Sequence, residues 1–440
     1  MENSVKTNGG FLERTFKLKE NNTNVKTEIL AGITTFMTMA YILVVNPLIL
    51  SDAGMNWGGV FTATAVSSII AILIMAFYAN YPFALAPGMG LNAFFTYSVV
   101  LTMKHSWEFA LTAVLIEGII FVILSLFKVR EAIFDAIPMN LKNAVSVGIG
   151  LFIAFIGLTS AGIVQQGGAI LELGDLGARP ALLAIIGIVI MGILLAKKVK
   201  GALLIGIIIT TIIGIPMGVT KVPNGIFGLP PSLKAVAFKF VGWDEIFTGD
   251  MLIVMFTFLF VDIFDTVGTL VGVSSKANML DKDGKLPRVS RALLADAIGT
   301  VAGACLGTST VTTYVESASG VAEGGRTGLT SFTTACMFAL ALFFAPIFTI
   351  VPGAATAPAL ILVGLFMMSP IRKINLEDYT EAIPAFLTII MMPLAYSIAE
   401  GIVFGMVSYV ILKVLDGKWK DVSIVMYILA GLFILKGIFF

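Results

Sequence analysis

The sequence predicts a protein built from membrane-spanning helices, and three observations lead to that fold class. Only 12% of its 440 residues are charged, about half the share found in soluble domains, while 58% are apolar. The mean hydropathy is +0.99. Apolar runs of roughly 17–25 residues, long enough to cross a bilayer as helices, recur along the chain. A soluble enzyme and a disordered chain are excluded, because neither carries so much apolar surface.

Fourteen apolar segments follow one another. The continuous ones are 28–50, 60–79, 109–128, 143–161, 180–197, 201–217, 250–273, 328–350 and 397–415. The weaker or interrupted ones are 83–103, 289–306, 308–323, 353–370 and 380–396. Because seven spans per half is an odd number, the second half is predicted to be inverted relative to the first. A last apolar stretch, 421–440, is expected to lie at the membrane surface or to cross it.

The basic residues predict which ends of the spans face the cytoplasm. The tail 1–27 is polar and lacks the apolar region of a signal peptide, so it is interpreted as cytoplasmic. With that orientation, 22 Lys and Arg residues lie in inside segments and 5 in outside segments. Cytoplasmic loops carry such an excess. Both termini are therefore predicted to be cytoplasmic, in a multi-pass protein of the plasma or inner membrane.

Two interrupted spans are the predicted binding region. In the first, Pro87, Gly88 and Gly90 break the helix, and the residues before Pro87 are expected to be extended. In the second, the hydroxyl-rich stretch 307–313 favours an extended backbone, with a short helix starting near Glu316. Broken backbone at membrane depth needs protein or a watery cavity around it. Interrupted segments in both halves of a chain are typical of a transporter binding site.

Carboxylates inside the spans each cost on the order of 2.5–3.5 kcal/mol. They are Glu117, Asp262, Asp265, Asp296, Glu316, Glu323 and Glu400. Asp265 and Glu316 are expected to bind a polar solute and to couple its movement to a proton; structural anchoring between helices is the alternative. Asp262 shares a helix face with Asp265 and is a further proton-coupling candidate or a scaffold. The other four are expected to be paired near helix ends.

Polar neighbours of these acids complete the predicted site. Asn92 follows the first break and is expected either to hydrogen-bond a planar solute or to cap the backbone. Ser317 stands next to Glu316, and Thr269 lies one helical turn after Asp265. The backbone at Gly88 is expected to line the same pocket.

Several chemistries find no support in the sequence. A lone histidine, His105, without an HExxH motif gives no zinc site, and no phosphate-binding GxxxxGK[ST] motif occurs. A net charge of +1 argues against nucleic acid as a partner. Cys305 and Cys336 are expected to be small buried apolar residues. No cofactor is expected other than a coupling ion, H⁺.

Four stretches in order resemble the AzgA-like purine permeases of the nucleobase/ascorbate transporter superfamily. They are 28–41 (EILAGITTFMTMAY), 86–95 (APGMGLNAFF), 262–270 (DIFDTVGTL) and 312–317 (TTYVES). The resemblance runs from about residue 11 to 415. It implies fourteen spans in two inverted repeats, with a core domain moving against a gate domain, commonly in a homodimer.

The resemblance also implies proton symport of hypoxanthine, guanine or adenine. The family's acids of spans eight and ten correspond to Asp265 and Glu316, with Asn92 on span three. Thr269 lies where the superfamily often has a polar side chain. The implied organisation is a tail (1–27), core halves (28–128 and 250–350), an extracytoplasmic loop (218–249), gate halves (129–217 and 351–415) and a C-terminal segment (416–440).

Three other functions were weighed. An anion permease of the same fold would favour basic residues at the breaks, which here carry acids. A passive channel would be insensitive to a proton gradient. An intramembrane aspartyl protease would need two facing carboxylates, whereas Asp262 and Asp265 point the same way from one helix.

Overall fold

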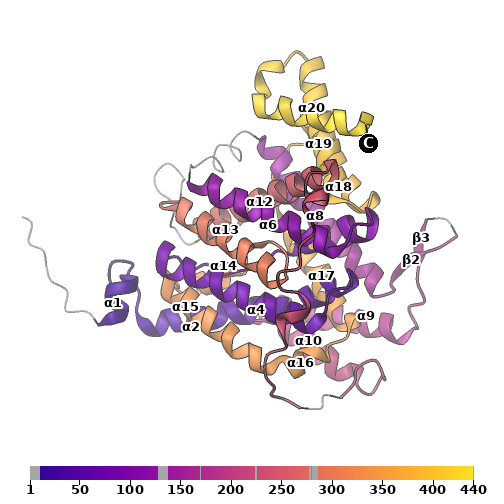
Figure 1. Cartoon of the computed structure of the whole chain (residues 1–440). Coiled ribbons are helices and arrows are strands. Elements are labelled where there is room, and N and C mark those ends of the chain that lie inside the picture. The colour runs from indigo at the N-terminus through magenta and orange to yellow at the C-terminus, as the bar shows by residue number, and fades with distance from the viewer. Residues whose placement is uncertain are drawn as a thin grey trace, which may run out of the picture.

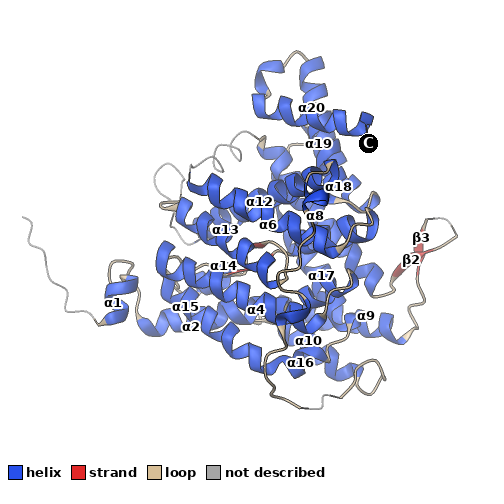
Figure 2. Cartoon of the chain, viewed as in Figure 1, coloured by secondary structure: helices blue, strands red, loops and turns tan. Residues whose placement is uncertain are grey.

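The computed structural model describes residues 10–126, 137–168, 170–222, 225–276, 279 and 286–439 (Figure 1). Helices dominate this part of the chain, and strands are confined to short segments (Figure 2). Within it, ten helices are long and apolar enough to cross a membrane. The predicted class, a mostly helical multi-pass membrane protein, is confirmed. The number of fourteen spans and the inverted repeat stay predictions.

Each of the fourteen predicted segments contains a helix. The first half has α1 (Phe11–Phe16), α2 (Val25–Met39), α3 (Ile42–Asp52), α4 (Trp57–Ile74), η1 (Met75–Ala79), β1 (Leu85–Pro87), α5 (Met89–Ala93), η2 (Phe94–Thr102), α6 (Trp107–Leu126), α8 (Met139–Ser160), β2 (Val164–Gln166), β3 (Leu171–Leu173), α9 (Arg179–Ala196) and α10 (Ala202–Gly214). Here η1 and η2 are π-helical, and each continues the helix before it.

The second half repeats this helical character. It has η3 (Leu233–Ala235), α11 (Trp243–Ile246), α12 (Gly249–Lys276), α13 (Val289–Leu306), β4 (Val311–Thr313), α14 (Ser317–Ala322), α15 (Gly328–Ala341), η4 (Leu342–Phe344), α16 (Ala345–Thr349), α17 (Gly353–Met367), η5 (Ser369–Lys373), α18 (Tyr379–Leu394), α19 (Ile398–Leu415), η6 (Trp419–Asp421) and α20 (Ile424–Phe439). The short η3, η4, η5 and η6 are 3₁₀ turns.

The two halves of the chain interleave instead of forming consecutive domains. Helix α13 packs against α4 and α6, and α15 packs against α2 and α4. Farther along the chain, α17 packs against α8 and α9, while α18 packs against α8 and α19. Two groups of helices result, each with members from both halves. Helix α20 rests on α19, and its Phe433 ring lies 5.8 Å from that of Phe256 in α12.

Four features were not predicted from the sequence. The first span is interrupted between α2 and α3, at Ala40 and Tyr41. The N-terminal tail is anchored: the α1 residue Phe16 is buried, with its ring 5.5 Å from that of Phe77. Strands β2 and β3 form an antiparallel hairpin. Finally, Cys336 is exposed and Cys305 partly exposed, because burial depends on which helices pack around a position and not on the apolar character of its own segment.

Candidate functional site

The two broken spans meet in a short antiparallel ribbon. Strand β1 pairs with β4, with Ala86 opposite Thr312. At the ends of the ribbon, the Gly88 N–H donates to the Thr310 carbonyl at 2.9 Å, and the Tyr314 N–H donates to that of Ala84 at 2.9 Å. The predicted extended stretches are thus confirmed, and each satisfies the other's backbone. Helix α14 begins at Ser317 with Glu316 as its N-cap residue, which agrees with the predicted start near Glu316.

Hydroxyl groups fasten the second broken span to the helices around it. Thr308 accepts a hydrogen bond from Asn46 of α3 at 2.8 Å, and Thr310 donates to Glu117 of α6 at 2.8 Å. The Val311 carbonyl accepts from Thr300 of α13 at 3.1 Å. Because each residue uses a different helix, the ribbon is held from several sides. These contacts explain the run of threonine and serine before Glu316.

Asp265 and Glu316 are brought together by this arrangement. The Thr312 hydroxyl donates to Asp265 Oδ2 at 3.3 Å, and the Tyr41 hydroxyl donates to Glu316 Oε1 at 2.7 Å. The two carboxyl groups interact electrostatically. Both residues keep partial exposure, whereas Thr312 and Tyr41 are buried. Two carboxyl groups are therefore held beside the ribbon, each oriented by a neighbouring hydroxyl.

Of the remaining residues predicted to contact the substrate, most make contacts within the protein. Asn92 is buried, and its side-chain oxygen accepts a hydrogen bond from Ser309, so it joins α5 to the second broken span. Ser317 is also buried, and its hydroxyl accepts from the Ala84 N–H at 3.0 Å. Gly88 lies against the strand: a Cβ there would be 3.0 Å from the Thr312 side chain. Thr269 is partly exposed on α12, one turn beyond Asp265.

The deeper acids share a second network. Asp262 and Asp296 are fully buried, and the Thr266 hydroxyl lies 3.0 Å from one and 2.9 Å from the other. Asp296 also interacts electrostatically with Asp265. The buried Glu117 binds Thr310 as described.

Of the four acids predicted near helix ends, Glu323 and Glu400 lie there, whereas the prediction is wrong for Glu117 and Asp296, which lie in the middle of α6 and α13. Glu323 follows the last residue of α14 and forms an ion pair with Lys200, with 2.5 Å between Nζ and Oε1. Glu400 is in the first turn of α19, where its N–H is capped by Ser397 at 3.3 Å.

Sequence reasoning missed the hydroxyl partners of the two acids. Tyr41 lies at the unforeseen break in the first span and reaches Glu316 across 275 positions of sequence. The Tyr314 hydroxyl, close to Glu316, donates to the Pro87 carbonyl at 2.5 Å and ties the two broken spans together. For Tyr314, a polar side chain within a recognised break was the available signal, because such a break leaves backbone groups that need partners. For Tyr41 no such signal was present, since its span was predicted to be continuous.

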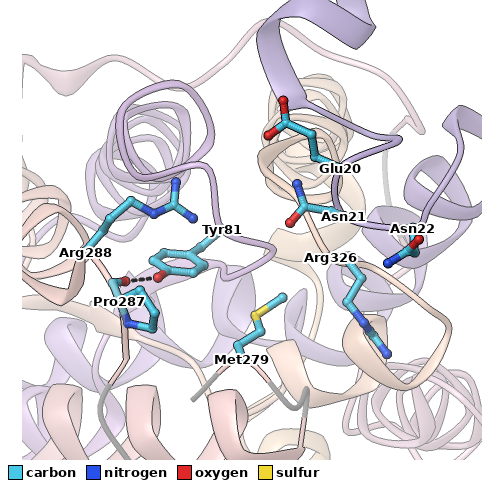
Figure 3. A pocket seen from close by; sticks show the side chains of 8 residues that line it. All are labelled: Glu20, Asn21, Asn22, Tyr81, Met279, Pro287, Arg288 and Arg326. Carbon is cyan, nitrogen blue, oxygen red and sulfur yellow. Dashed lines mark hydrogen bonds between the residues drawn. The ribbon is translucent and has the colours of Figure 1, made fainter. Parts of the chain in front are cut away.

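A separate cavity of about 640 Å³ lies between the N-terminal segment and the start of α13 (Figure 3). In it, the Arg288 guanidinium stands 4.8 Å from the centre of the Tyr81 ring, and the Tyr81 hydroxyl donates to the Pro287 carbonyl. None of the predicted substrate-binding residues lines this cavity. In the described part of the chain, no group of three or more His, Cys, Asp or Glu side chains could hold a metal ion.

Comparison with known proteins places this geometry in a family. Residues 26–404 match the model of a permease family, which includes nearly all of the described spans and both broken ones. The chain belongs to this permease family. The resemblance to purine permeases of the nucleobase/ascorbate transporter family is confirmed by this match together with the full-length relatives, and the permease is a transporter, not an enzyme.

Permeases similar over nearly their whole length support the same family. The permease is 53% identical over 430 residues to a putative permease of Methanocaldococcus jannaschii, covering 98% of each chain. It is 47% identical to a guanine/hypoxanthine permease of Bacillus subtilis, covering 96% of this chain and 99% of that protein. It is 42% identical to an adenine permease of Escherichia coli, covering 98% and 97%.

Solved structures share the fold. The transmembrane domain of a cyanobacterial bicarbonate transporter, BicA, superposes with a TM-score of 0.66 at 17% identity, covering 86% of this chain and 97% of that one. The structure of SLC26A9 gives a TM-score of 0.62 at 12% identity, covering 92% and 67%. At these identities the likeness concerns the fold alone.

Proposed function

We propose that this permease imports purine nucleobases by proton symport. One observation carries the proposal: Asp265 of α12 and Glu316 of the second broken span lie together beside the paired strands, each oriented by a neighbouring hydroxyl. Carboxylates accept hydrogen bonds from the N–H groups along a purine edge. The relatives named as adenine and guanine/hypoxanthine permeases support the same substrate class. Because two close acids repel each other, uptake of a proton by one of them would assist binding.

The movement we propose is an elevator in a fourteen-span protein of the cell membrane. The core group comprises α2 to α6 and α12 to α16, and the gate group α8 to α10 and α17 to α19. Antiparallel pairing of β1 with β4 is what two inverted repeats would produce at their shared centre. The core, with the ribbon, slides against the gate. Both termini are cytoplasmic in this proposal, and two copies associate as a homodimer.

Uptake of radiolabelled hypoxanthine and adenine tests the site. We expect Asp265→Asn and Glu316→Gln each to abolish uptake while membrane expression persists. Glu172→Gln is the matched control, because it removes a carboxylate from the exposed strand β3. Normal uptake in both site variants would contradict the assignment.

Two further arms distinguish the mechanisms. A protonophore should abolish accumulation by a symporter and leave a passive channel unaffected. Competition by unlabelled adenine, guanine and hypoxanthine should reveal the preferred base, whereas competition by sulfate or bicarbonate alone would favour an anion permease.

A further inference from the structure

Helix α14 follows Glu316, and at its other end it contacts the turn between α9 and α10. Its six residues are followed by Glu323, whose Oε1 lies 2.5 Å from Lys200 Nζ. Lys200 belongs to the turn between α9 and α10. One short helix thus carries the substrate-binding acid at its start and an ion pair at its end.

Helix α14 is firmly attached to α2. A Cβ added at Gly320 would stand 2.1 Å from the Thr35 hydroxyl oxygen and 2.7 Å from the Ala31 carbonyl, so the two backbones are in direct contact. Arg326 secures the end of α14, since its Nη1 donates to the Val321 carbonyl at 2.7 Å. Through this packing, α14 and α2 must move together.

Lys200 is attached to the other group of helices. Helices α9 and α10 pack against each other and both pack against α17. The turn between them approaches the core, because α10 also touches α2. The Lys200–Glu323 pair therefore crosses the boundary between the two groups that slide in the proposed elevator.

We propose that the Lys200–Glu323 pair is the contact that holds α14, and with it Glu316, in the arrangement seen here. This inference rests on the proposed elevator movement. When the core slides along the gate, the two side chains must separate. The free energy of the ion pair therefore contributes to the ratio of the populations of the two end states of the transport cycle. Lys200 and Glu323 are positioning residues: neither needs to touch the substrate.

The size of the effect follows from the exposure of the pair. The Lys200 side chain is 52% exposed and that of Glu323 23%. Ion pairs of this kind shift an equilibrium by roughly two- to five-fold. We expect Lys200→Gln and Glu323→Gln each to change the purine KM and the maximal rate by about that factor, with little loss of expressed protein.

Charge reversal separates this role from a merely structural one. Lys200→Glu and Glu323→Lys should each be impaired, and the double variant should recover the wild-type KM and rate. Lys17→Gln is the matched control, since it removes an exposed Lys–Glu pair of 3.2 Å that lies within the N-terminal segment. Failure of the double variant to recover, with each single variant impaired, would overturn the proposal.

Cross-linking tests the separation directly. In a protein with Cys305→Ser and Cys336→Ser, the pair Lys200→Cys and Glu323→Cys is joined by a bifunctional methanethiosulfonate reagent. We expect purine uptake by the cross-linked protein to stop and to return on reduction. Uptake by either single-cysteine variant should not change when the reagent is added. Continued uptake by the cross-linked protein would refute the inference. Failure of the proposed function would instead appear before cross-linking, as a lack of purine uptake by the parent protein.

Discussion

Replacing Tyr41 with phenylalanine removes the hydroxyl that orients Glu316. Tyr41 is 1% exposed, between α2 and α3, and its hydroxyl donates to Glu316 Oε1 at 2.7 Å. Phenylalanine keeps the ring, so the packing around it is preserved. What changes is the position of the carboxylate, which loses its donor and is free to turn away from the substrate.

The expected loss follows from the strength of that hydrogen bond. A hydrogen bond to a charged group contributes about 1.5–3 kcal/mol. Since about 1.4 kcal/mol corresponds to a factor of ten, we expect the ratio of maximal uptake rate to KM to fall roughly 10- to 100-fold. Most of the fall should appear in KM, because the proposed site has Glu316 in contact with the bound solute.

The assay is a concentration series of labelled hypoxanthine in cells lacking other purine permeases. Tyr97→Phe serves as the matched control, because its hydroxyl also donates to a carboxylate, Asp52 Oδ2, at 2.9 Å. That change should lower thermal stability and leave KM within about threefold. An unchanged KM in Tyr41→Phe, or an equal loss in both variants, would refute the assigned role of Tyr41.

Two further predictions concern stability. Glu28 is fully buried and accepts hydrogen bonds from the Arg326 N–H at 2.8 Å and the Thr330 hydroxyl at 2.6 Å, so Glu28→Gln should destabilise the protein by about 2 kcal/mol or more. A lowered thermal midpoint in detergent would show this, with Glu20→Gln on the surface as control. Hydrogen bonds from the Thr380 side chain and N–H lower the pKa of Asp378 to about 2 from its usual 3.8. Because the folded-state pKa is the lower one, this stabilisation is complete above pH 4 and is lost as the pH falls towards 2. Asp378→Asn should weaken the dependence of the melting temperature on pH between pH 4 and 2. The same fall in melting temperature in the variant as in the wild type would contradict the prediction.

The helices were largely predictable because crossing a membrane imposes a local rule. A span must be long, apolar and hydrogen-bonded within itself, and each of these demands is visible in a short window of sequence. Segments that do not meet these demands can be recognised in the same way. Pro87 and its glycines, and the hydroxyl-rich stretch before Glu316, were recognised as breaks, and the structure forms strands there.

The partners of these breaks were not predictable, because they lie far away in the chain. Nothing local specifies that Pro87 stands opposite Val311. Asn92 illustrates the consequence: by sequence it was a substrate ligand or a cap, and in the structure it binds Ser309. A polar side chain next to a break serves whichever segment folds against it.

By itself, the sequence determined the membrane class, the positions of the two broken spans and the identity of the acids that lie within apolar segments, since hydropathy and helix breaking are local properties. The tertiary structure alone decided which of these acids are fully buried and which keep partial exposure. Asp262 and Asp265 are three residues apart on one helix, yet the first is fully buried and the second partly exposed beside Glu316. Burial depends on which helices pack around a residue, and those contacts join distant segments of the chain.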